Sequence, residues 1–120
     1  MNSNIMVWNA QGCGSSKFIR YSKQYMRDHY PDIFVFFETR VSGVSASKVI
    51  NALGYSNSHR VEAGGFSEGI WLYWSDIVTV EVLFFHFQFI LCRISTSGSA
   101  FSYLATFFYA SPNYRKRRSL

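Results

Sequence analysis

Two polar side chains directly follow apolar runs that are typical of buried strands. Asn9 follows the run 5–8, and Glu38 follows the run 33–37. If a helix joins the two strands in a right-handed parallel unit, both carboxyl ends lie at one end of the sheet, where ligands of open α/β sheets bind. A carboxylate beside an amide suits a hard, oxygen-preferring cation such as magnesium. The spacing predicts a metal site at Glu38 and Asn9, although each residue alone is also explained as a turn former or a solvated charge.

The segments around these strands predict the helices that would position them. Apolar residues recur every three to four positions over 18–26, which indicates an amphipathic helix with Ser15 or Ser16 as its N-cap. A second helix is expected over 45–53, closed by Gly54. The outward face of the first helix is polar and cationic, with Lys17, Arg20, Lys23, Gln24 and Arg27.

Beyond the second helix the apolar period changes to two, which favours strands separated by short turns. Five strands are expected in succession, at 58–62, 70–74, 78–84, 87–94 and 102–109. Short turns between successive strands predict an antiparallel meander. The order strand, helix, strand, helix and then a meander places the chain in the α/β class, as a layered sandwich.

Composition and charge indicate one folded domain with a basic tail. Of the 120 residues, 48% are hydrophobic and only 16% are charged, which argues against disorder. The net charge is +5, and the run Arg115, Lys116, Arg117 and Arg118 supplies four of these charges. We therefore expect a domain over 1–113 and a tail over 114–120. Such a tail can bind nucleic-acid phosphates, although most short terminal charge runs are only solvated.

Several other classes of protein are disfavoured by the sequence. Cys13 and Cys92 lie far apart and form no C-x-x-C pair, so neither a disulfide framework nor a zinc site is expected. No secretory signal is apparent at the N-terminus. The longest apolar run, 82–94, contains polar residues and is too short to cross a bilayer. We expect no membrane partner and a reducing, intracellular compartment, with the nucleus as one option.

Four short motifs, in this order, carry a resemblance to a known family. They are Trp8-Asn9-Ala10-Gln11-Gly12, Phe37-Glu38-Thr39-Arg40, Gly69-Ile70-Trp71-Leu72 and Phe108-Tyr109-Ala110-Ser111-Pro112-Asn113. The chain resembles the endonuclease/exonuclease/phosphatase family over nearly all of its length. It looks most like the N-terminal endonuclease domain of plant non-LTR retrotransposon polyproteins, and more distantly like abasic-site endonucleases.

The resemblance implies a role for each matching residue. Asn9 would position the scissile phosphate or its water, and Glu38 would bind Mg²⁺, with Mn²⁺ as an alternative. Tyr109 would donate a hydrogen bond to a phosphate oxygen, and Asn113 would contact the nucleic-acid backbone. The implied reaction is in-line attack of water on a phosphodiester of DNA, with the developing charge stabilised by metal and donors.

The chain also departs from the family pattern. The family's Asp-x-Asn and Asp-His pairs have no match, since His29, His59 and His86 lie in other contexts, and Glu68 stands where relatives commonly have glycine. The resemblance therefore implies a truncated half of a four-layered α/β sandwich whose C-terminal half is missing. Such a half would expose the inner face of one sheet and would be inactive alone.

Three functions remain open from the sequence. The first is a fragment of a magnesium-dependent endonuclease acting on nucleic acid. The second is a non-catalytic retroelement relic with weak nucleic-acid binding. The third is a phosphatase of the same superfamily, because a fold does not specify its substrate.

Overall fold

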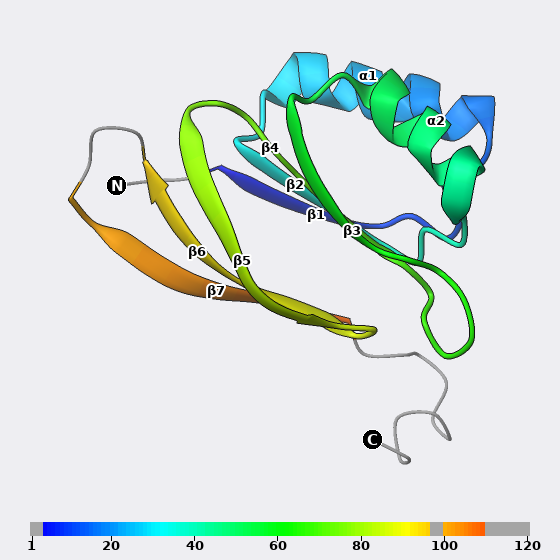
Figure 1. Cartoon of the computed structure of the whole chain (residues 1–120). Helices are drawn as coiled ribbons and strands as arrows, with labels where there is room; N and C mark the ends of the chain where they lie inside the picture. Colours follow the sequence, from blue (N-terminus) through cyan, green and yellow to red (C-terminus); the bar gives the residue numbers. More distant parts are fainter. Residues whose placement is uncertain (1–3, 97–99, 110–120) are drawn as a thin grey trace.

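The computed structural model describes residues 4–96 and 100–109. Within these residues the chain forms two helices and seven strands arranged in three layers, with the helices on one side of the larger sheet (Figure 1). The elements are β1 (Ile5–Asn9), α1 (Ser16–His29), β2 (Ile33–Phe37), α2 (Gly43–Leu53), β3 (Asn57–Val61), β4 (Ile70–Trp74), β5 (Val78–His86), β6 (Phe89–Thr96) and β7 (Ser102–Phe108). The predicted α/β layered class is confirmed.

The larger sheet has four strands in the order β1-β2-β4-β3. β1 and β2 are parallel, and their register places Asn9 opposite Phe37. β4 is antiparallel to both of its neighbours, β2 and β3. The predicted strand, helix and parallel strand is therefore present, and both strands end at the same end of the sheet.

The smaller sheet is an antiparallel meander of β5, β6 and β7. The expected meander of five strands is wrong in its extent, because β3 and β4 belong to the larger sheet. The reason lies in β4, whose first four residues are all buried and therefore need cover on both faces. A place between β2 and β3 gives β4 that cover, whereas the burial of β5 largely alternates along its first six residues.

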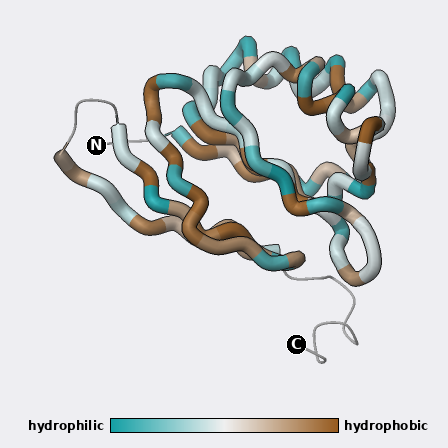
Figure 2. The backbone as a smooth tube through the Cα atoms, viewed as in Figure 1, coloured by the Kyte–Doolittle hydropathy of each residue, from teal (hydrophilic) through white to brown (hydrophobic). Residues whose placement is uncertain are grey.

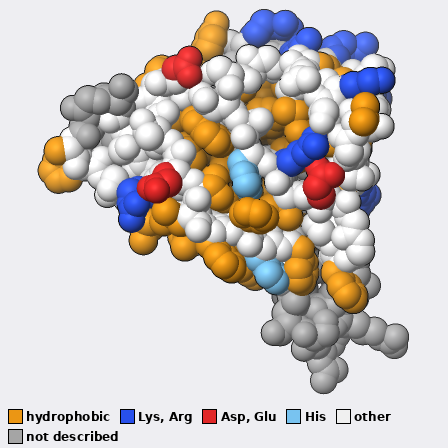
Figure 3. Space-filling model, viewed as in Figure 1, with side chains coloured by type: hydrophobic (Ala, Val, Ile, Leu, Met, Phe, Trp, Pro, Cys, Tyr) orange, Lys and Arg blue, Asp and Glu red, His pale blue; other side chains and the backbone are white. Residues whose placement is uncertain are grey.

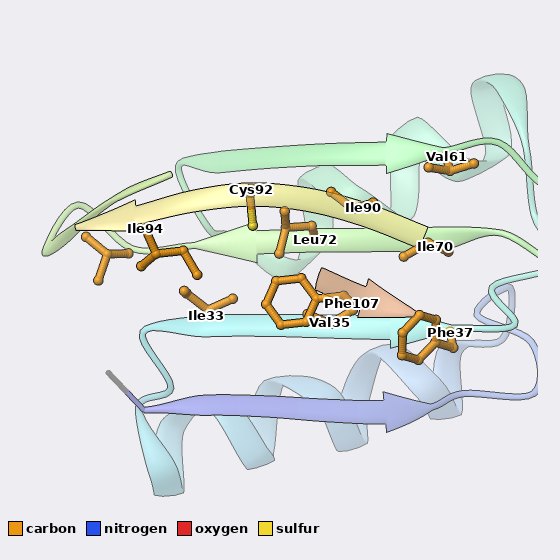
Figure 4. Packing of buried hydrophobic residues seen from close by; sticks show 11 residues of the cluster. Ile33, Val35, Phe37, Val61, Ile70, Leu72, Ile90, Cys92, Ile94 and Phe107 are labelled. Atoms are coloured by element: carbon orange, nitrogen blue, oxygen red, sulfur yellow. The ribbon is translucent and has the colours of Figure 1, made fainter. Parts of the chain in front are cut away.

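Two apolar interfaces hold the layers together, and β2 contributes to both because alternate side chains point to opposite faces. Ile33, Val35 and Phe37 face the smaller sheet, and they pack with Leu72 of β4 and with Ile90, Ile94 and Phe107 of the smaller sheet (Figure 4). Phe34 and Phe36 face the helices, and they pack with Trp71 and Tyr73 of β4 and with Met26, Ala46, Val49 and Leu53 of the helices. Every residue of β2 is buried as a result.

The expectation of an exposed inner sheet face is wrong for this chain. The inner face of the larger sheet is covered by β5, β6 and β7 of the same chain. The exposed apolar surface is instead the outer face of the smaller sheet, where Phe84 is 58% and Phe108 is 56% exposed. These rings stack on either side of Phe89. In Figure 2 the strands of the smaller sheet are in part strongly hydrophobic, whereas α1, on the opposite side of the larger sheet, is more hydrophilic.

The helix ends follow the sequence signals. Ser15 caps α1, since its side chain accepts a hydrogen bond from the amide of Phe18 at 3.1 Å. Gly54 closes α2 in the left-handed conformation, as expected for a helix C-terminus. No helix in the described ranges is both long and apolar enough to cross a membrane.

Candidate site at the carboxyl ends of the parallel strands

The chain leaving β2 is held between two other loops by backbone hydrogen bonds. On one side the amides of residues 10, 12 and 13 donate to the carbonyls of residues 37–39 at 2.7–2.9 Å. On the other side the amides of residues 39 and 40 donate to the carbonyls of residues 69 and 68 at 3.4 and 2.9 Å. Residues 38–40 are therefore fixed at the centre of this end of the sheet.

Unusual backbone conformations concentrate in these loops. Gln11, Glu38 and Arg40 have φ values of 52°, 56° and 57°, and they are three of the four described non-glycine residues with positive φ. The fourth, Tyr30, caps the end of α1. Left-handed φ costs energy for such residues, and strain of this kind clusters at functional sites.

A close approach between Thr39 and Gly69 locks the loop after β2 against the start of β4. Gly69 has a φ of +91°, and a Cβ built on it would lie 1.9 Å from Oγ1 of Thr39. The Thr39 side chain is fully buried. A residue with a side chain at position 69 would collide with Thr39 as well as adopt a strained backbone, so the sequence requires glycine there.

Three charged side chains meet at this end of the sheet. Nη2 of Arg40 lies 2.5 Å from Oε1 of Glu38, and Nε of Arg40 lies 3.4 Å from Oε2 of Glu68. The Glu38 side chain is only 4% exposed, while those of Arg40 and Glu68 are 51% and 29% exposed. One guanidinium therefore bridges two carboxylates, of which one is buried.

Tyr109 reaches the same place from the end of β7. Its amide donates to the carbonyl of Gln88 at 2.7 Å, and its ring stacks on Phe37 with 5.6 Å between ring centroids. Burial raises the pKa of Tyr109 to about 12, and the charge of Glu38 and hydrogen bonding to it add to the shift. The phenol therefore stays protonated at neutral pH and remains a hydrogen-bond donor. We call Glu38, Arg40, Glu68 and Tyr109 the Glu38 cluster.

Asn9 lies at the same end of the sheet but faces a different hollow. Asn9 is the last residue of β1 and pairs in register with Phe37, which is the residue before Glu38. It lines a pocket of about 310 Å³ together with Ser15, Lys17 and the ring of Tyr21, and Glu38 does not line this pocket. Within the described part of the chain, the Asn9 side chain makes no hydrogen bond.

The carboxylates of the Glu38 cluster could hold a hard cation if the Arg40 guanidinium moved away from them. Mg²⁺ is commonly held by one or two carboxylates, with water and substrate phosphates as the other ligands. Glu38 and Glu68 provide two carboxylates, although no group of three or more His, Cys, Asp or Glu among the described residues could hold a metal. Because Arg40 lies between the two carboxylates, its guanidinium would have to move for a cation to bind.

The structure brings together some of the residues singled out from the sequence. Glu38 and Tyr109 are neighbours, and Asn9 shares their end of the sheet. Asn113 and the basic run 115–118 lie outside the described residues. The sequence assigned no role to Arg40 and noted Glu68 only as a departure. The sequence does contain a signal for these two residues. Arg40 is a cation two residues after Glu38, and Glu68 is an acid next to Gly69.

No protein-family model matches the chain, and a search of curated proteins finds no match either. Many activities share α/β layered folds, so the fold alone does not specify one. The function has to be argued from the residues at this end of the sheet.

Proposed function

We propose that the Glu38 cluster is part of the site of a magnesium-dependent phosphodiesterase acting on nucleic acid, of the endonuclease/exonuclease/phosphatase family. The observation that carries the proposal is a buried carboxylate, Glu38, beside a protonated phenol, Tyr109, at the carboxyl end of a parallel strand pair. The four motifs that resemble this family, found in order along the chain, support the same proposal.

Each residue would have a distinct role in such a site. Glu38, with help from Glu68, would hold Mg²⁺ or Mn²⁺ through carboxylate oxygens. Tyr109 would donate its hydroxyl hydrogen to a phosphate oxygen. Asn9 lines a separate pocket, so it would orient the phosphate or the attacking water only for a substrate that reaches both places. A bound divalent cation would stabilise negative charge on the phosphoryl oxygens.

These 120 residues would supply only part of the catalytic set. They contain no match to the Asp-x-Asn and Asp-His pairs that complete the site in the family they resemble. Catalytic groups act as a unit, so loss of a base and a transition-state donor costs several orders of magnitude in rate. We expect no measurable hydrolysis of DNA by this chain alone. Magnesium-dependent nicking that disappears in Glu38→Ala would contradict this expectation.

A second candidate function follows from the position of Arg40. Its guanidinium pairs with both carboxylates, which is where a metal ion would otherwise lie. In this alternative the cluster is a structural ion-pair network, and the chain is a non-catalytic nucleic-acid-binding relic. The two candidates make opposite predictions about metal binding.

The deciding experiment is a Mn²⁺ titration of the whole chain, followed by paramagnetic broadening of backbone amide NMR signals. Under the proposed function, signals near residues 38, 68 and 109 broaden first. Glu38→Gln abolishes this broadening, because it removes the buried carboxylate charge. Arg40→Gln lowers the Mn²⁺ concentration needed, because it removes the competing cation.

The matched control is Glu81→Gln, which removes an exposed carboxylate that pairs with Arg93 in the smaller sheet. It should leave the broadening at the Glu38 cluster unchanged. If Glu38→Gln and Glu81→Gln behave alike, or if Arg40→Gln binds no better than the natural chain, the structural alternative holds and the metal proposal fails.

A further inference from the structure

Among the described residues, positive charge without a carboxylate partner is concentrated on α1. In the described residues, each arginine outside α1 pairs with a carboxylate, namely Arg40, Arg60 and Arg93. The four cations of α1 have no carboxylate partner among the described residues. They are Lys17, Arg20, Lys23 and Arg27. The single acid of α1, Asp28, accepts instead from the side chain of Gln24 at 3.1 Å.

These four side chains form one continuous surface, the cationic face of α1. All four are exposed, and they recur at intervals of three to four residues, which places them on one side of a helix. In Figure 3, blue side chains gather along the side of the molecule where Figure 1 shows α1. Lys48 of α2 adds an exposed cation to the same helical layer.

The cationic face leads toward the candidate site. Lys17, at its N-terminal end, lines the same pocket as Asn9. From Lys17 to Arg27 the helix rises about 15 Å, and a DNA duplex carries one phosphate of each strand per about 3.4 Å of its axis. The face is therefore long enough to contact more than one phosphate of the duplex.

We propose that the cationic face of α1 binds the phosphodiester backbone of duplex DNA along the approach to the pocket at Asn9. This surface goes beyond the proposed metal site, because it involves none of the residues of the Glu38 cluster and needs no divalent ion. Binding is independent of sequence, since the contacts are to phosphates and not to base edges.

The surroundings of α1 favour DNA over a lipid surface. A helix that lies on a membrane buries its apolar face among the lipids. The apolar face of α1 is already used, because Phe18, Ile19, Tyr25 and Met26 pack against the larger sheet. What remains outside is mostly charge, which suits phosphates held in water.

The test uses fluorescence anisotropy of a short labelled DNA duplex in EDTA, which removes any contribution from a metal site. All variants are made in the full chain with residues 115–118 changed to glutamine, so that the basic tail does not mask the effect. The test variant is Lys23→Gln with Arg27→Gln, since glutamine preserves helix propensity. The matched control is Arg60→Gln with Arg93→Gln, which removes the same charge from ion-paired sites.

The test variant should lose about tenfold in affinity at about 50 mM salt. The slope of log affinity against log salt should become shallower by about 1.8, at about 0.9 for each phosphate contact. The control variant should bind within about twofold of its parent. Circular dichroism melting confirms that each variant is folded.

Three results would overturn the proposal. Equal losses in the test and control variants would mean a net-charge effect without a site. No loss in the test variant would mean that α1 does not contact DNA. Binding to phosphatidylserine vesicles without binding to the duplex would identify a membrane surface instead. The assay is made in EDTA, so failure of the metal site leaves this test unaffected.

Discussion

The two sheets differ in what covers their outer faces. The larger sheet has helices on one side and the smaller sheet on the other, so all five residues of β2 are buried. Among the described residues, the smaller sheet packs on one side only, and Phe84, Leu104 and Phe108 remain exposed on its other side. The doubly covered sheet is the one that carries Asn9 and Glu38 at its end.

This difference explains how a polar site can be held in position. A carboxylate that directly follows a fully buried strand is held in place because the strand itself is tightly packed. Backbone hydrogen bonds to the loops on either side hold Glu38 further. The smaller sheet contributes one residue to the cluster, Tyr109, which is anchored by stacking on Phe37 of the larger sheet. Positioning therefore comes mainly from the covered sheet.

The largest expected effect contrasts two phenylalanines with opposite surroundings. Phe36 is fully buried and lies against the rings of Phe18 and Tyr73, with centroid distances of 5.2 and 5.8 Å. Phe36→Ala should lower the free energy of unfolding by about 3–5 kcal/mol, because it leaves a cavity. Phe84→Ala, on the exposed face, should cost less than about 1 kcal/mol. Urea unfolding measures both, and similar losses would refute the contrast between the sheets.

A smaller effect is expected where the loop after β2 meets the start of β4. Gly69→Ala should lower the free energy of unfolding by about 2–3 kcal/mol, since the new Cβ meets Thr39 and the φ of +91° is strained for alanine. Adding Thr39→Ala removes the colliding hydroxyl and should restore part of the loss. A double variant no more stable than Gly69→Ala alone would show that backbone strain, without the collision, sets the requirement for glycine.

The smallest effect concerns pH at the junction of the two sheets. His59 of β3 packs on Phe85 of β5 with 4.9 Å between ring centroids, and burial lowers the pKa of His59. The unfolded chain therefore binds a proton more readily than the folded chain, so stability is full above the unfolded pKa of about 6.5 and falls as pH decreases through it. His59→Phe should remove this part of the pH dependence of urea unfolding. An unchanged pH dependence in His59→Phe would contradict this explanation.

Local patterns in the sequence were enough for most elements of the fold. The apolar run 33–37 and the amphipathic spacing over 18–26 correspond to β2 and α1, because burial on two faces or on one face dictates where apolar residues recur. Gly54 ends α2 as expected from its sequence context. Helix starts and strand ends moved by up to a few residues, as in α2, which begins at Gly43.

The pairing of strands could not be read from the same patterns. Period-two runs indicate strands but do not name their partners. The continuous apolar run of β4 indicates burial on both faces, but it does not specify that β4 pairs with β2 and β3 instead of with β5. That division also decided which apolar face is covered. The partner of a strand depends on long-range packing, which only the folded chain specifies.

The sequence by itself determined the types of residue available for chemistry and the order in which they occur. It placed Asn9 and Glu38 after two strands, and a β-α-β unit brings such positions to one end of a sheet. Only the tertiary structure decided that Arg40 and Glu68 join Glu38, that Tyr109 lies beside it, and that the α1 cations have no carboxylate partner among the described residues. Ion pairing depends on distances of a few ångströms between residues far apart in the chain, and those distances are set by how the layers pack.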